Sequence, residues 1–188
     1  MMQRVFPKQA FLDDLLARNA ANLALVQTTF APLDRAARST QPDPNEWCVD
    51  QCVEHLVLAF DLHLAHMLPL LERDAGVDSA ETFTRSWTAR QNFYQKQFDP
   101  RNKAKTLPRV TPTDHFYPDV YTRFAAQKER FTTILERTRK ADLQRRGWFL
   151  RFLPVNVGDY LEMFVRHDEL HIDQVQRALA THRQFAAA

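Results

Sequence analysis

Glycine is scarce in this sequence, with three residues among 188. Tight turns and left-handed backbone use glycine most often, so a chain this poor in it has few such turns. Hydrophobic residues make up 45% of the chain, which is enough to bury a sizeable core at this length. Together these properties favour long helices in a single domain covering residues 1–188.

Apolar residues recur at helical spacing in four segments, each long enough to form several turns. We predict helices over about residues 7–30, 48–73, 117–140 and 156–179. Asn156 is placed to cap the last of them, and Asp159 adds a negative charge at its amino end. The fold class is therefore all-α.

Residues 77–112, between the second and third predicted helices, have a different character. The segment is rich in aromatic residues, which are Phe83, Trp87, Phe93, Tyr94 and Phe98. Prolines at positions 100, 108 and 112 interrupt any long helix here. We predict a packed, partly helical excursion.

Three histidines stand where two of the predicted helices could bring them together. His167 and His171 are four residues apart, so both lie on one face of a helix, one turn from each other. His55 lies on the second predicted helix and can supply a third nitrogen from a facing side. Neutral histidine is the commonest metal ligand, and three ligands leave a position open for water or substrate. The pattern predicts a zinc or nickel site in a helical bundle.

Charge and composition exclude several other classes of protein. Lys and Arg total 25 against 23 Asp and Glu, too balanced to require nucleic acid or an anionic membrane as partner. The first thirty residues carry charges where a signal peptide needs an apolar stretch, and no segment is apolar enough to span a membrane. Cys48 and Cys52 are one helical turn apart, where a disulfide would be strained. We expect reduced thiols in a cytoplasmic protein.

Two segments resemble a known family. Trp47 to Leu56, which reads Trp-Cys-Val-Asp-Gln-Cys-Val-Glu-His-Leu, is similar to the Trp-Ser-x-x-Gln-x-x-x-His-Leu start of the second helix in DinB-like proteins. Residues 159–179, which hold His167 and His171, resemble the last helix of that family. Cys48 replaces the usual serine, which weakens the expected helix cap. The 77–112 region does not align.

The resemblance implies a four-helix bundle with a long crossover and a divalent metal, commonly nickel or zinc, on His55, His167 and His171. Iron and manganese are alternatives. Relatives include transferases and isomerases that use thiols such as bacillithiol or mycothiol, and presumed hydrolases. The resemblance therefore implies a metal-dependent enzyme acting on a small molecule, with a low-molecular-weight thiol as a candidate cosubstrate. The sequence identifies no general base.

Two other readings of the histidines stay open. The bundle could be a non-catalytic module that binds a metal or a small ligand, or it could hold no metal, with the histidines hydrogen-bonded in its core. We also predict a homodimer, and the apolar segment 148–153 is either a packed connection or a dimer surface. The basic residues that flank it suggest nucleic acid, but no DNA-binding motif supports that interpretation.

The neighbours of the three histidines have simpler interpretations. His66 is eleven residues after His55, about 16 Å along a helix, so we interpret it and His63 as ordinary partly buried histidines. Asp168 could orient a ligand or its water, or could form a surface or inter-helix hydrogen bond. Glu169 lies about 200° around the helix from His167, which excludes the His-Glu-x-x-His arrangement of metalloproteases.

Three residues early in the second helix also call for an interpretation. Cys52, three residues before His55, is a conceivable ligand but fits better as a packed core thiol. Trp47 is expected to anchor the start of this helix by packing against a neighbour. Glu54, like Asp168, could orient a ligand or its water, or could form a surface or inter-helix hydrogen bond.

Overall fold

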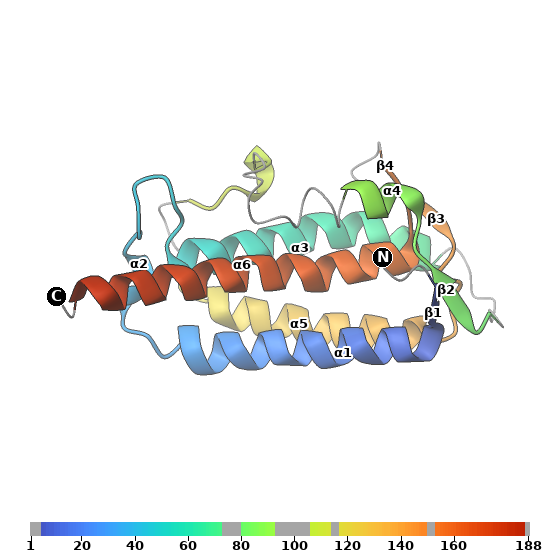
Figure 1. Ribbon diagram of the computed structural model, residues 1–188, viewed down its shortest axis with the longest axis horizontal. Coiled ribbons are helices and arrows are strands. Elements are labelled where there is room, and N and C mark those ends of the chain that lie inside the picture. Colours follow the sequence, from blue (N-terminus) through green and yellow to red (C-terminus); the bar gives the residue numbers. More distant parts are fainter. Residues whose placement is uncertain (1–4, 73–79, 93–105, 114–116, 150–152, 187–188) are drawn as a thin grey trace.

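The computed structural model describes residues 5–72, 80–92, 106–113, 117–149 and 153–186. Four long helices run along the molecule (Figure 1): α1 (Lys8–Leu25), α3 (Val49–Glu72), α5 (Val120–Thr138) and α6 (Val157–Ala186). A π-helical turn, η1 (Val26–Phe30), continues α1 to the predicted end of the first helix. The four predicted helices are confirmed, with boundaries within about three residues, except that α6 continues beyond position 179 to Ala186.

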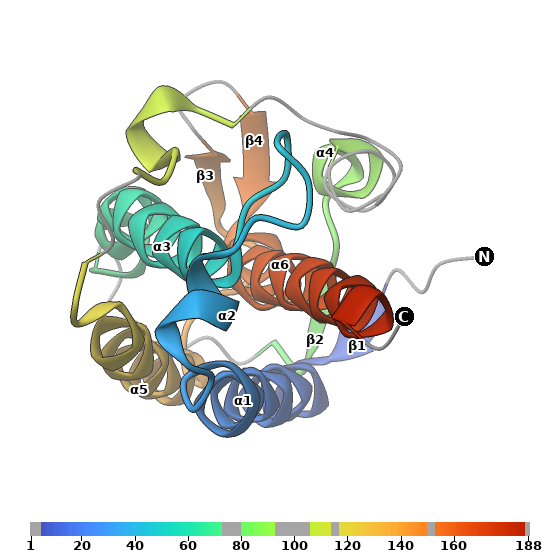
Figure 2. The ribbon, with the colours of Figure 1, turned by 90° about the vertical axis from the view of Figure 1, so that its left-hand side faces the viewer.

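The helices form a bundle in which α3 packs against α5 and α6, and α1 packs against the same two (Figure 2). Consequently α1 and α3 occupy opposite corners, as do α5 and α6. The chain crosses one end of the bundle between α1 and α3 through the short helix α2 (Arg35–Ser39). Asp34 caps α2 by accepting a hydrogen bond from the Ala37 amide at 2.8 Å.

Aromatic side chains fill the middle of the bundle. The ring of Phe164 on α6 lies 5.1 Å from that of Phe60 on α3 and 5.2 Å from that of Phe131 on α5. Leu12 and Leu15 of α1 complete this layer and are fully buried. A second core cluster, between η1 and the first turns of α3, includes Phe30, Val53 and Phe124.

Short strands close the opposite end of the bundle, and the sequence analysis did not predict them. β1 (Val5–Pro7) pairs antiparallel with β2 (Thr82–Thr84), and β3 (Arg146–Phe149) pairs antiparallel with β4 (Leu153–Asn156). Strands of three or four residues are too short to give a reliable alternation of apolar and polar residues. The partner of β1 is also far away in the sequence.

The predicted excursion between α3 and α5 contains β2, the helical turn α4 (Trp87–Ala89) and the 3₁₀ turn η3 (Pro108–Val110). The turn η3 packs over α3 (Figure 1). Phe83 is buried, whereas Trp87 is exposed. Phe93, Tyr94 and Phe98 lie outside the described residues. None of the described helices is both long and apolar enough to cross a membrane.

The start of α6 differs from the prediction. Asn156 directly precedes the helix, but its side-chain amide donates to the Thr84 carbonyl at 2.9 Å, because β4 places it beside β2. Asp159 instead accepts hydrogen bonds from the backbone amides of Asn156, at 3.2 Å, and Ser86, at 3.0 Å. Burial raises the pKa of Asp159 to about 6. This carboxylate ties α6 to the excursion.

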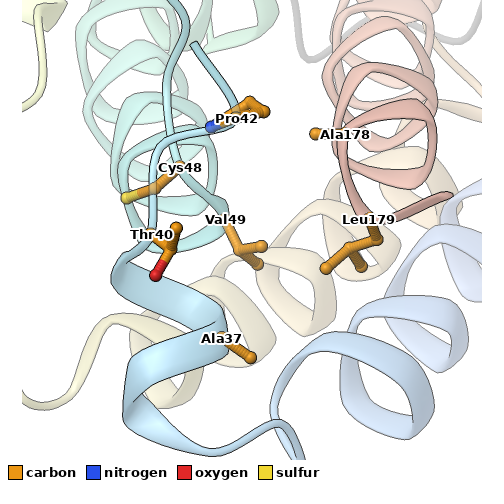
Figure 3. Close-up of a pocket in the computed structure, with 7 residues that line it drawn as sticks. All are labelled: Ala37, Thr40, Pro42, Cys48, Val49, Ala178 and Leu179. Atoms are coloured by element: carbon orange, nitrogen blue, oxygen red, sulfur yellow. The ribbon is translucent and has the colours of Figure 1, made fainter. Parts of the chain in front are cut away.

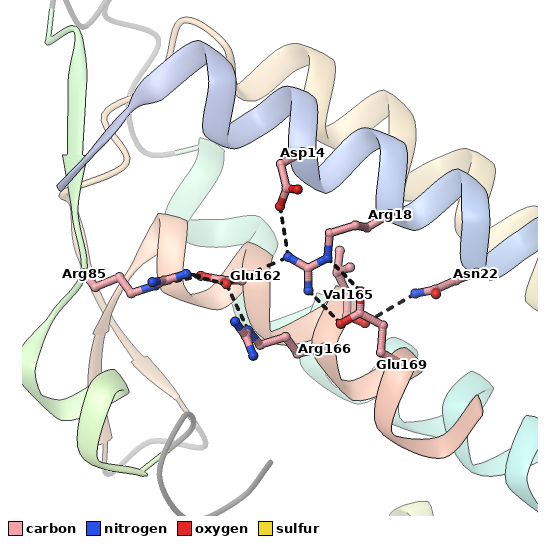
Figure 4. Close-up of polar contacts among 8 residues, drawn as sticks. All are labelled: Asp14, Arg18, Asn22, Arg85, Glu162, Val165, Arg166 and Glu169. Atoms are coloured by element: carbon pink, nitrogen blue, oxygen red, sulfur yellow. Dashed lines mark hydrogen bonds and ion pairs between the residues drawn. The ribbon is translucent and has the colours of Figure 1, made fainter. Parts of the chain in front are cut away.

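Ion pairs fix α6 against α1 and the excursion (Figure 4). Two guanidinium nitrogens of Arg18 on α1 each donate to a carboxylate oxygen of Glu169 at 2.7 Å. Glu162, almost fully buried, accepts hydrogen bonds from Arg85 and, at 2.9 Å, from Arg166. Glu169 thus points to α1 and away from the histidines, as its position on the helix predicted.

Candidate metal centre

The structure brings the three predicted histidines together. His55 lies in the second turn of α3, and His167 and His171 lie one turn apart on the face of α6 that packs against α3. One ring nitrogen from each comes within 4.8 Å of the others. The Nε2 atoms of His55 and His167 are 3.2 Å apart. Among the described residues, no carboxylate or thiol joins this cluster.

Hydrogen bonds to the other ring nitrogens determine which lone pairs face the centre. The Nδ1 of His55 donates to the Val110 carbonyl at 2.7 Å, so a neutral ring keeps the lone pair on Nε2. The Nδ1 of His171 donates to Oε1 of Gln174 at 3.1 Å, which likewise leaves its Nε2 as acceptor. Metal-binding histidines are usually oriented in this way.

The spacing of these nitrogens fits a divalent ion. Two nitrogens bound tetrahedrally to one zinc, each at about 2.05 Å, are about 3.3 Å apart, close to the separation between His55 and His167. The same separation suits a hydrogen bond donated by His167 in the metal-free protein. That bond needs only two rings, however, whereas three nitrogens converge here.

All three rings are neutral at physiological pH. Burial lowers the pKa of His55 and brings that of His171 down to about 3. Burial also holds the pKa of His167 well below its usual value, helped by the neighbouring His171 and His55. Neutral imidazole is the form that binds metals, so little proton competition opposes binding.

Trp47 forms one wall of the site. Its ring lies 4.8 Å from that of His55 and 5.9 Å from that of His171, measured between centroids. The predicted role at the start of α3 is confirmed in part, since Trp47 packs on a neighbour, but that neighbour is the histidine cluster. Sequence spacing carries no signal for this contact, because His171 comes from the far end of the chain.

A segment of the excursion covers the α3 side of the site. Val110 accepts the hydrogen bond from His55, and Thr113 donates to the carboxylate of Glu54 through its hydroxyl at 3.3 Å. Adjacent residues of α3 thus hold residues 110–113 in place. Burial raises the pKa of Glu54. No motif in the sequence pairs positions 54 and 55 with this segment.

The other candidates do not belong to the cluster. Cys52 is buried with a raised pKa, which keeps it a thiol, and it is not in the cluster. His63 contacts the Tyr160 hydroxyl at 3.4 Å and stacks on Phe149, so it belongs to the core. Asp168 forms an inter-helix ion pair with Lys128, one of the two alternatives considered for it.

A small hollow lies at the end of the bundle that carries α2 (Figure 3). Its lining is mostly apolar and includes Cys48, Val49 and Leu179. None of the three histidines lines it. Of the three histidines, His55 is buried, and His167 and His171 are partly exposed.

Fold and site together define a helical-bundle protein with a candidate metal centre made by two of its helices. The family model of the DinB superfamily matches residues 19–175, and the chain belongs to that superfamily.

Among solved structures, the fold is similar to that of YfiT from Bacillus subtilis, described as a probable metal-dependent hydrolase with an unusual four-helix bundle topology. The TM-score is 0.51 at 14% sequence identity, over 91% of this chain and 85% of the other. None of the curated proteins compared with this chain matches it.

Proposed function

We propose that this protein is a metal-dependent enzyme acting on a small molecule, by hydrolysis or by thiol transfer, with nickel or zinc on His55, His167 and His171. The convergence of three neutral ring nitrogens from α3 and α6 is the observation that supports it most directly. The description of YfiT as a probable metal-dependent hydrolase agrees with this proposal.

The residues of the site have separable roles. A divalent ion bound here supplies a Lewis acid and lowers the pKa of a coordinated water or thiol toward neutrality. The histidines hold it, while Val110 and Gln174 fix the tautomers of two of them. Trp47 covers one side of the rings of His55 and His171, and the partly exposed residues His167 and His171 mark the side from which a substrate would approach.

Metal content tests the proposal. Protein purified without an affinity tag or chelator is expected to carry about one nickel or zinc ion per chain by mass spectrometry. His167→Ala and His171→Ala should abolish this, whereas His66→Ala, a matched change on α3 outside the cluster, should not. Wild-type protein that contains no metal and takes up none when it is added would overturn the proposal.

The orientation of His171 gives a finer test. Gln174→Leu removes the acceptor for its Nδ1–H and is expected to weaken metal binding by about 10- to 100-fold, as other outer-shell changes do. Titration against a competing chelator measures the affinity. Gln176→Leu, at an exposed position on the same helix, is the control. Equal affinities for the two variants would contradict the assigned role of Gln174.

Substrate screens separate the two reaction types. Metal-loaded protein that cleaves activated esters or amides without added thiol is a hydrolase. Turnover of an electrophile only in the presence of a low-molecular-weight thiol indicates transfer. A fully loaded protein inactive in both screens would favour a non-catalytic binding module.

A further inference from the structure

A buried ion pair crosses the centre of the bundle next to the histidine cluster. Lys128 of α5 donates from its ammonium group to the carboxylate of Asp168 on α6. The two side chains are 1% and 5% exposed. Because α5 and α6 occupy opposite corners, this contact spans the diagonal of the bundle (Figure 2).

The surroundings of the pair are mostly apolar. The Lys128 ammonium lies 4.9 Å from the ring centroid of Phe124 and 5.2 Å from that of Phe60. The Asn19 side chain donates to the Lys128 backbone carbonyl at 3.0 Å, which fixes this turn of α5 against α1. A pair this deeply buried contributes little net stability, because desolvation offsets its attraction, and apolar replacements are often as stable. Stability alone therefore does not account for it.

Three consecutive residues of α6 have partners on three other helices. His167 faces His55 on α3, Asp168 binds Lys128 on α5, and Glu169 is gripped by Arg18 on α1. Successive side chains are about 100° apart around a helix, so these contacts together fix the rotation of α6 about its axis. Two of these three residues, Asp168 and Glu169, are charged, and of the two only Asp168 is buried.

We propose that the ion pair between Lys128 and Asp168 is a positioning device for the metal centre. It holds the turn 167–171 of α6 in the rotation that directs His167 and His171 at His55. This inference rests on the proposed function, since it concerns the affinity and geometry of the metal site. Asp168 does not touch the cluster itself but acts through the helix that carries two of its ligands.

Cobalt binding to the metal-free protein separates positioning from stability. Asp168→Asn is expected to weaken the affinity for Co²⁺ by about 10- to 100-fold. The double variant Lys128→Met with Asp168→Leu replaces the pair with apolar side chains and should keep about the wild-type resistance to urea. It should still bind Co²⁺ at least about tenfold more weakly, with an altered visible spectrum.

The control is Arg85→Met, which removes a partner of the buried Glu162 on another face of α6. It should lower the resistance to urea but leave the Co²⁺ affinity and spectrum unchanged. If the double variant folds and binds Co²⁺ with wild-type affinity and spectrum, the positioning role is wrong while the proposed metal site stands. If the wild-type protein binds no Co²⁺, the proposed function fails and this inference fails with it.

Discussion

Single residues determine the protonation of the candidate metal centre. Each histidine lies where burial disfavours the charged ring, and two of them donate their remaining proton to an acceptor outside the cluster. The Val110 carbonyl can only accept a hydrogen bond, so the Nδ1 of His55 must carry the proton. Backbone geometry thus determines the tautomer of His55. The site is therefore preorganised for a cation before one arrives.

The lowered pKa of His171 predicts how stability depends on pH. The ring takes up a proton near pH 6.5 in the unfolded chain but near pH 3 in the folded protein. Between these values the unfolded state binds more protons, so this residue lowers the free energy of unfolding as the pH falls. Urea unfolding of chelated wild type and His171→Ala, followed from pH 7 to about pH 4, measures the effect.

The advantage of wild type over His171→Ala should shrink by up to about 1.4 kcal/mol for each pH unit below 6.5. The raised pKa of Asp159 acts in the opposite direction, but it is present in both proteins and cancels in the difference. A difference that does not change with pH would show that His171 is not buried as a neutral ring.

At the scale of elements, α6 holds two of the three ligands and is fixed along its length. Asp159 ties its first turn to the excursion, Glu162 binds Arg85 and Arg166, and Glu169 binds Arg18 (Figure 4). The excursion reaches the site again through Val110. The segment that the sequence predicted least well therefore contacts both histidine-bearing helices.

Close packing between α6 and β2 predicts a cost for a small substitution. A Cβ atom added at Gly158 would lie 2.6 Å from the ring of Phe83, which is fully buried and cannot easily move. Gly158→Ala should lower the free energy of unfolding by about 1–3 kcal/mol. Helix propensity alone would favour alanine by about 1 kcal/mol, so the sign of the change measured in urea is decisive.

Gly147→Ala is the comparison for this prediction. There the added Cβ meets the tip of the Leu70 side chain, which can rotate away. A smaller loss of stability is expected at this position. If Gly158→Ala instead stabilises the protein, the contact between Gly158 and Phe83 is looser than described.

At the scale of the whole molecule, a bound ion would cross-link α3 and α6, the helices that enclose the site. A ligand that binds only the folded state at a free concentration of 100 times its Kd adds about 2.7 kcal/mol to the free energy of unfolding. For a domain of this size, that is a rise in Tm of about 5 to 11 °C.

Zinc or nickel at saturating concentration should produce this rise in chelated wild-type protein and not in His55→Ala. Thermal melts by circular dichroism report it directly, because most of the described chain is helical. An equal rise in both proteins would place the metal elsewhere. The comparison does not depend on knowing the substrate.

The sequence by itself determined the four long helices and the three histidines. Both rest on local periodicity: apolar residues at helical spacing define α1, α3, α5 and α6, and the four-residue spacing of His167 and His171 puts them on one face. The pattern of histidines on two helices predicted His55 opposite them, the resemblance to DinB-like proteins supported that prediction, and the packing of α3 against α6 agrees with it.

Only the tertiary structure decided what surrounds the histidines. The contacts concerned are those of Trp47 with two of the rings, of Val110 with His55, and of Lys128 with Asp168. The residues that they join lie about 8 to more than 120 positions apart in the sequence. The same holds for Asn156, whose side chain binds Thr84 of β2 instead of capping α6. Periodicity within a segment records which face is buried but not which partner buries it, and that choice depends on the packing of the complete bundle.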